Sequence, residues 1–104
     1  MNYKLVFTVP VSHADLVRKA VGEAGAGKQG NYSFCSFSVR GVGRFKPEAD
    51  ANPAIGEIGK LEEVEEERVE CLVDEEVITE VLAALKKVHP YEEPSYEIYK
   101  LGDF

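Results

Sequence analysis

The sequence is short of basic residues and of long apolar runs. Its 104 residues include 12 Lys and Arg against 19 Asp and Glu, which gives a net charge of -7. No basic stripe is present to meet the phosphates of nucleic acid, and the same charge disfavours an anionic membrane surface. The longest apolar runs fall far short of the ~20 residues that span a bilayer. We therefore predict no nucleic-acid partner and no membrane partner.

Targeting signals and common catalytic motifs are also missing. The first residues, 1–4, lack the charged start and long apolar stretch of a signal peptide, so the predicted location is cytoplasmic. The sequence contains no G-x-S-x-G, C-x-x-C, P-loop or H-E-x-x-H motif. It has two histidines, His13 and His89, and two cysteines, Cys35 and Cys71. A reducing cytoplasm keeps such cysteines as free thiols.

Six segments alternate between strand and helix patterns, and together they predict the fold. Four have strand alternation and two have apolar residues at helical spacing, the first of these after a capping box at Ser12. In chain order the segments are 3–9, 12–24, 31–39, 61–73, 74–88 and 96–101. This order predicts a single α+β domain over 1–104, a ferredoxin-like βαββαβ sandwich with a four-stranded antiparallel sheet and two helices on one face.

Two further expectations follow from this arrangement. The sheet face without helices is expected to be lined by Tyr32, Phe34, Leu72 and the tyrosines of the last strand, and an uncovered apolar face usually has a partner. Cys35 and Cys71 are expected on neighbouring strands, facing the helices, because free cysteine behaves as a small hydrophobic residue.

Residues 41–59 interrupt the pattern with four glycines and two prolines. Glycine and proline at this density predict a loop rather than a core element. A loop of this length in a compact domain is usually functional or contacts a partner. We therefore expect part of any binding site here.

The stretch H-P-Y-E-E-P, residues 89–94, joins the second helix to the last strand. Pro90 stops the helix and Pro94 favours an extended residue before the strand. His89, Glu92 and Glu93 offer one imidazole and two carboxylates, a ligand set that suits a divalent transition metal. The alternative is that His89 ends the helix as an imidazolium and the glutamates are solvated. Both interpretations stay open at this point.

Under the second interpretation the helix end and the nearby carboxylates favour the charged form of His89. We then expect that replacing His89 by alanine costs about 1 kcal/mol or less at neutral pH. Pro90→Ala and Tyr91→Ala are expected to destabilise the fold more.

Four motifs carry a resemblance to a known family: G-N-Y-S-x-C-S-F, G-x-F-x-P, A-N-P-x-I-G-x-x-G-x-L-E and H-P-Y-E-E-P. With them, nearly the whole chain resembles the CutA-like, PII-like insert domain of the YqfO/YbgI family, the NIF-three-like proteins. The resemblance implies a ferredoxin-like unit that forms trimers. The family's two-metal site belongs to a core outside this domain, so neither its ligands nor its hydrolase label carries over. Phe34 stands where the family pattern often has histidine.

The function expected from these features is that of a non-catalytic, oligomeric binding or regulatory module. It would sense a small molecule or a divalent metal at clefts between subunits, with a trimer favoured. Its expected ligand contacts are Asn31, Tyr32, Arg44, Lys46 and Tyr91, and its expected metal ligands are His89, Glu92 and Glu93. One alternative is a small metal-dependent hydrolase that uses His89 with Glu92 or Glu93. Another is a docking subunit for a separate protein.

Overall fold

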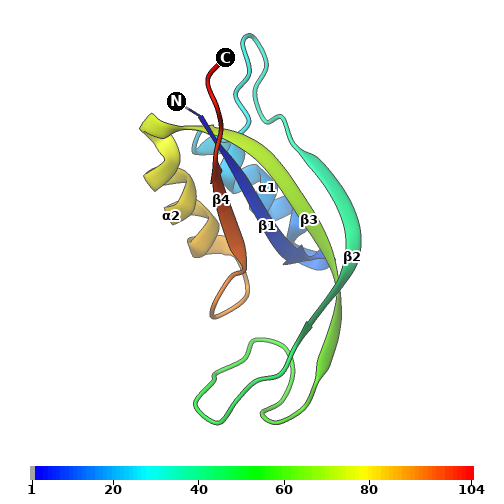
Figure 1. Ribbon diagram of the computed structural model, residues 1–104. Helices are drawn as coiled ribbons and strands as arrows, with labels where there is room; N and C mark the ends of the chain where they lie inside the picture. The colour runs from blue at the N-terminus through cyan, green and yellow to red at the C-terminus, as the bar shows by residue number, and fades with distance from the viewer. Residues whose placement is uncertain (1) are drawn as a thin grey trace.

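The computed structural model describes residues 2–104 as four strands and two helices. In chain order these are β1 (Asn2–Pro10), α1 (Ala14–Glu23), β2 (Phe37–Phe45), β3 (Glu62–Asp74), α2 (Ile78–Val88) and β4 (Tyr96–Lys100). All neighbouring strands are antiparallel, in the order β2-β3-β1-β4. Both helices cover the same face of the sheet (Figure 1). The predicted ferredoxin-like α+β sandwich is confirmed.

The core lies between the helices and the two central strands. Alternate residues of β1 and β3 face the helices, and they meet the apolar stripes of α1 and α2. Fully buried members of this core are Leu5, Phe7, Val9, Val17, Val69, Val73, Val81 and Leu85. Leu16 also fits the helical spacing of apolar residues in α1, but it is 52% exposed and is not part of this core.

The helix starts differ from the capped start predicted at Ser12. A 3-10 turn precedes each α-helix: Val11–His13 comes before α1, and Glu75–Val77 comes before α2. Neither helix has a side-chain cap at its first turn. The Ser12 hydroxyl instead forms a hydrogen bond with His13 Nδ1 at 2.9 Å. The capping box predicted at Ser12 is therefore wrong, because the 3-10 turn moves the α-helix start to Ala14.

The second strand lies six residues later than its predicted start. Residues 31–36 belong to a loop, and residues 41–45, predicted as loop, extend β2. Phe34 breaks the alternation because its φ is +58° and its ring packs against Gly22 of α1, where a Cβ would overlap it. The long loop therefore covers 46–61 instead of 41–59. Gly41 and Gly43 are accommodated because β2 is an edge strand with a paired neighbour on one side only.

The cysteines occupy different environments. Cys71 is buried on β3 and faces the helices, as expected, whereas Cys35 is half-buried in the loop before β2. Both are free thiols. The expectation that Cys35 lies on a strand and faces the helices is wrong, because the strand begins only at Phe37.

This difference predicts selective labelling of the native protein. Burial raises the pKa of the Cys71 thiol to about 11, so little reactive thiolate is present at neutral pH. A bulky maleimide should therefore label Cys35 first and reach Cys71 only on unfolding, as read by intact-mass spectrometry. The Cys35→Ser variant should stay unlabelled while folded. Equal labelling rates at the two thiols would show that Cys71 is accessible.

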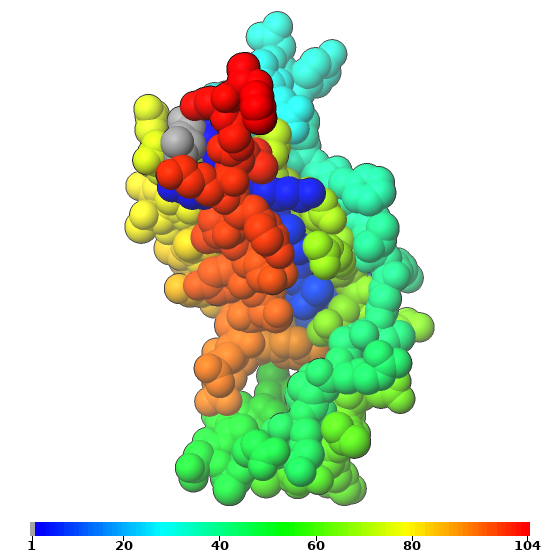
Figure 2. Space-filling model, viewed as in Figure 1, coloured from blue at the N-terminus to red at the C-terminus, as the bar shows by residue number. Residues whose placement is uncertain are grey.

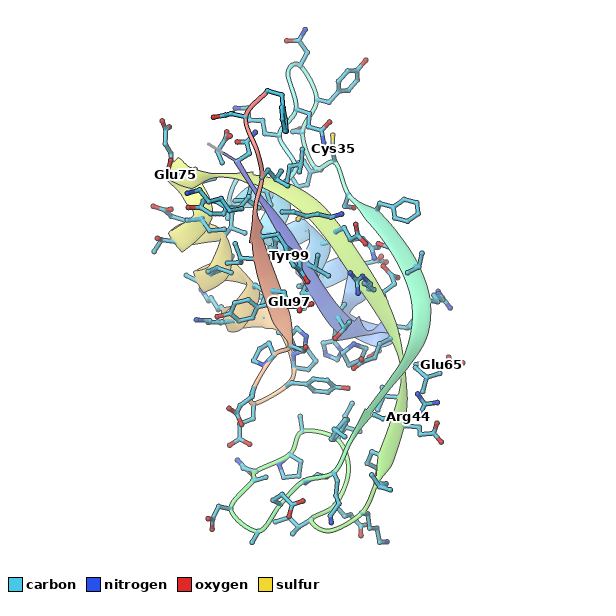
Figure 3. All side chains as sticks on the ribbon, viewed as in Figure 1. Cys35, Arg44, Glu65, Glu75, Glu97 and Tyr99 are labelled. Atoms are coloured by element: carbon cyan, nitrogen blue, oxygen red, sulfur yellow. The ribbon has the colours of Figure 1, made fainter. Side chains whose placement is uncertain are left out.

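The sheet face opposite the helices is open and carries exposed apolar groups. Phe37 is 66% exposed and Val39 is 47% exposed. Tyr99 of β4, which is labelled in Figure 3, is also exposed. Leu72 also lies on this face, opposite Lys4, as expected. Tyr32 and Phe34 lie in the loop before β2 instead, and Tyr96 packs against the core.

Within residues 2–104 no helix is long and apolar enough to cross a membrane.

Candidate ligand-binding site

A cavity of about 610 Å³ lies where the β2–β3 hairpin extends beyond the helices. Three segments form its walls: the strand pair at 39–45 with Glu66 and Arg68, the loop at 47–55, and the turn at 91–95. Figure 2 shows the surface recessed between this turn and the hairpin loop. Ligand sites for small molecules have volumes of roughly 300–1,000 Å³. The cavity is therefore large enough for a metabolite.

The long loop is folded and held against the turn. Pro47 is buried, and its carbonyl accepts a hydrogen bond from the Gly59 N–H at 2.8 Å. The Asn52 N–H donates to the Glu92 carboxylate at 3.0 Å. This bond joins two segments that are 40 residues apart in the sequence. The outer wall of the cavity is thus attached to the opposite wall.

Glu66 places a buried carboxylate at the cavity wall. Its side chain comes from β3 and the residue is 7% exposed. The Tyr91 hydroxyl donates to Glu66 Oε2 at 2.8 Å. Burial and this bond raise the pKa of Tyr91, so its hydroxyl remains protonated as the donor. The Tyr91 ring also meets Phe45 edge to face, with ring centroids 5.5 Å apart.

Two glycines of β2 leave the space that this cavity occupies. Gly41 faces Glu66 across the strand pair and has no atom near the position where a Cβ would lie. At Gly43 a Cβ would overlap the Glu66 carboxylate. Gly43 therefore lets the carboxylate pack against the β2 backbone, and Gly41 keeps the adjacent space open.

His89 lies behind this wall and supports the turn. It is 6% exposed and ends α2 in an extended conformation, with φ −66° and ψ 133°. Nε2–H donates to the Thr8 carbonyl at 2.7 Å, and Nδ1 accepts from the Tyr91 N–H at 3.2 Å. This pair of bonds requires the neutral ring with its proton on Nε2. The ring therefore connects β1 to the turn.

The prediction that His89 is charged is wrong. Burial lowers its pKa below the ordinary 6.5, although the Thr8 carbonyl and the Glu66 charge act in the opposite direction. The helix-end argument failed because it assumed a solvated ring, whereas the extended backbone turns this one into the protein.

The lowered pKa predicts that acid destabilises the fold. Below pH 6.5 the unfolded chain protonates His89 while the folded chain resists, so unfolding takes up a proton. The free energy of unfolding should therefore fall as the pH drops from 6.5 through the folded-state pKa. Urea unfolding at pH 7.5, 6.5 and 5.5 measures this slope. In His89→Gln the slope should be smaller, and an unchanged slope would assign it to other groups.

The structure brings together some of the predicted ligand contacts and separates others. Arg44 and Tyr91 line the cavity. Lys46 follows β2, forms an ion pair with Glu48 at 3.7 Å and does not line the cavity. Asn31 and Tyr32 lie in the loop before β2, at the opposite end of the molecule (Figure 1). These two residues cannot share a site with Tyr91 within one chain.

The predicted metal ligands are also placed in different environments. Glu92 and Glu93 line the cavity, but both ring nitrogens of His89 already have hydrogen-bond partners in the protein. Among residues 2–104 no group of three or more His, Cys, Asp and Glu side chains is arranged to hold a metal ion. The metal site remains a prediction that this arrangement does not support.

Comparison with known proteins gives the relatives of this chain. No family model matches it. The GTP cyclohydrolase 1 type 2 homolog of Halalkalibacterium halodurans is 54% identical over 101 residues, which are 97% of this chain and 27% of that protein. The Bacillus subtilis protein of the same name is 49% identical over 96 residues, 92% of this chain and 26% of its own. The chain thus spans about a quarter of the length of these relatives.

A solved structure gives the same relationship. The Bacillus cereus protein related to NIF3 superposes with a TM-score of 0.84 at 44% identity, covering 98% of this chain and 26% of that one. This chain is homologous to one segment of the NIF3-related proteins. CutA, the periplasmic divalent cation tolerance protein from Archaeoglobus fulgidus, has a TM-score of 0.72 at 20% identity and is covered over 87% of its length. The NIF3-related segment therefore shares its fold with CutA.

Most residues of the cavity wall were not predicted as site residues, among them the three that shape the space around the buried carboxylate. Glu66 stands in an acidic run at 62–67, a pattern that by itself indicates a solvated strand face, and Gly41 and Gly43 belong to the stretch 41–59 that was predicted as a loop. The available signal was the G-x-G spacing next to a strand. Glycines two apart in a strand lie on the same face, which opens space there for a neighbouring side chain or a ligand.

Proposed function

We propose that this chain is a non-catalytic binding module whose small-molecule ligand occupies the cavity between the β2–β3 hairpin and the 91–95 turn. The observation that supports this most strongly is the cavity itself, about 610 Å³ with mainly apolar walls that also carry arginine and glutamate side chains. Phe45, Pro47 and Ile55 contribute apolar surface, and Tyr91 and Glu66 contribute polar atoms.

The absence of an activated nucleophile among the lining residues supports binding over catalysis. The His89 ring is bonded to Thr8 and Tyr91, so it offers no free nitrogen to a substrate. Tyr91 is held as a protonated donor to Glu66. Neither cysteine lines the cavity. His89 therefore has no free nitrogen with which to act as the general base that the hydrolase alternative requires.

A cavity-filling variant tests this proposal. Gly41→Leu places a side chain in open space within the cavity, so it should fold and should block the ligand. Wild type and variant are titrated with a panel of nucleotides, amino acids and divalent metal salts, using thermal shift and calorimetry. We expect at least one organic compound to stabilise the wild type and to have no effect on Gly41→Leu.

The matched control adds the same side chain elsewhere. Ala83→Leu lies on an exposed position of α2 and should bind like the wild type. If no compound in the panel binds, or if the compounds that bind do so equally well in Gly41→Leu, the cavity is not a ligand site.

We propose in addition that the chain self-associates, with a trimer as the favoured state. Phe37 and Val39 expose apolar surface on β2, which is an edge strand and has unpaired backbone groups along one side. Exposed edges and apolar patches on the same strand favour pairing with another chain. A second copy brought against β2 would also lie close to the cavity wall at 39–45.

Light scattering after gel filtration tests self-association directly. The wild type should elute as a particle of several times 11.5 kDa, and Phe37→Lys should shift it toward the monomer. Leu61→Lys is the control, because Leu61 is 79% exposed but lies in the long loop. A wild-type particle of 11.5 kDa at micromolar concentration would contradict the proposal.

A further inference from the structure

We propose that the cavity recognises an organic cation, and that Glu66 Oε1 accepts the hydrogen bond from its amidinium, guanidinium or ammonium group. This inference rests on the proposed binding function and specifies the chemistry of the ligand. It follows from the environment of one carboxylate and from the surfaces on either side of it.

The Glu66 carboxylate has hydrogen-bonding capacity that the protein does not use. A carboxylate accepts about four hydrogen bonds, and buried carboxylates are normally paired with a cation or several donors. In the part of the chain that the structure describes, the only hydrogen-bond donor to the Glu66 carboxylate is the Tyr91 hydroxyl, which binds Oε2. The residue is 7% exposed, and it lines the cavity. Oε1 is therefore the atom free to accept from a ligand.

Three arginines line the cavity with Glu66, namely Arg40, Arg44 and Arg68, and two of them are paired with other carboxylates. Arg44 donates to Glu63 at 3.1 Å, and Arg68 donates to Glu70 at 3.3 Å. Across residues 2–104, neither of these arginines nor any other cationic side chain forms an ion pair with Glu66. The fold thus supplies no ion-pair partner to the Glu66 carboxylate, and a ligand cation would provide one.

Gly43 determines where Oε1 lies. Because a Cβ at Gly43 would overlap Oε1, the carboxylate packs directly against the β2 backbone. The open space at Gly41, two residues along the same face of β2, adjoins it within the cavity. A planar donor group can therefore approach the carboxylate along β2 without meeting a side chain at either glycine.

The aromatic pair beside the carboxylate favours the same ligand class. Phe45 and Tyr91 both line the cavity, with their rings edge to face at 5.5 Å. Aromatic faces attract organic cations, and the attraction increases in a site that excludes water. A cavity that combines a carboxylate, two aromatic rings and apolar loop residues favours a cation that carries an apolar body.

Benzamidinium is a suitable probe because it combines a planar cationic donor with an aromatic ring. Its binding to the wild type is measured by protein-observed NMR titration, in parallel with neutral benzamide and anionic benzoate. We expect benzamidinium to bind and the other two to bind at least roughly 10-fold more weakly, the ratio that loss of a charged hydrogen bond produces. In Glu66→Gln, whose amide has the same shape, benzamidinium affinity should fall roughly 10- to 100-fold.

Gly43→Ala provides a second variant, since it displaces the carboxylate without changing its charge, and it should also weaken benzamidinium. Equal binding by wild type and Glu66→Gln, or no preference for benzamidinium over benzamide, overturns the inference. The inference is also overturned if benzamidinium does not bind while another compound of the panel binds and is blocked by Gly41→Leu. That result would leave the proposed binding function intact. If no compound at all is sensitive to Gly41→Leu, the binding function fails as well.

Discussion

Replacing His89 by alanine is expected to lower the free energy of unfolding at pH 7 by about 2–4 kcal/mol. The ring is 6% exposed, and its loss leaves the Thr8 carbonyl and the Tyr91 N–H without their partner. It also leaves a cavity at the junction of β1, α2 and the turn. This is a larger effect than the 1 kcal/mol or less expected from the sequence, since that figure assumed a solvated imidazolium.

His13 is the matched control, because it is the second histidine of the chain and lies half-exposed in the 3-10 turn before α1. His13→Ala should change the free energy of unfolding by about 0.5 kcal/mol or less. Urea denaturation of both variants at pH 7 gives the comparison. Similar values for the two variants would mean that the His89 hydrogen bonds contribute little to stability.

Gly27→Ala is expected to destabilise the fold by about 3 kcal/mol or more. Gly27 has φ +79°, which costs energy for any residue with a Cβ. Its N–H donates to the Leu72 carbonyl at 2.7 Å and its carbonyl accepts from the Cys35 N–H at 2.9 Å. A Cβ here would overlap the Cys35 backbone, which cannot move without breaking these bonds.

Gly59→Ala distinguishes the conformational cost of a positive φ from the steric overlap that a Cβ causes at Gly27. Gly59 has nearly the same backbone conformation, with φ +83°, but no atom lies near the position of its Cβ. This variant should therefore show only the conformational cost, about 1–2 kcal/mol. Thermal and urea unfolding of both variants measure the difference. Equal destabilisation would remove the steric argument at Gly27.

The fold was predictable where side-chain alternation and burial agree. The alternation of β1 includes Phe7, the apolar stripe of α2 includes Val81 and Leu85, and all three residues are buried. The prediction of the β2 bounds was wrong because the strand-like alternation of the sequence begins before the strand itself. Residues 31–36 alternate like a strand, but Phe34 adopts a positive φ and packs on Gly22, a contact between distant segments that no local pattern contains.

The candidate site was predictable only in part, for a related reason. Arg44, Tyr91, Glu92 and Glu93 were singled out by their residue types and all line the cavity. The role of Glu66 depends on the register that pairs it with Gly41 and on the Tyr91 hydroxyl that reaches it from another segment. Register and long-range contacts of this kind arise from tertiary packing, so the sequence pattern showed only an acidic run.

The central claim is that a small molecule binds between the β2–β3 hairpin and the 91–95 turn. Backbone amide chemical shifts of the wild type, recorded with and without each compound of the panel, test it most directly. We predict that shift changes cluster on the two walls, at residues 41–45 and 91–95, and disappear in Gly41→Leu. Changes confined to the 28–36 loop, or changes that persist unaltered in Gly41→Leu, would contradict the claim.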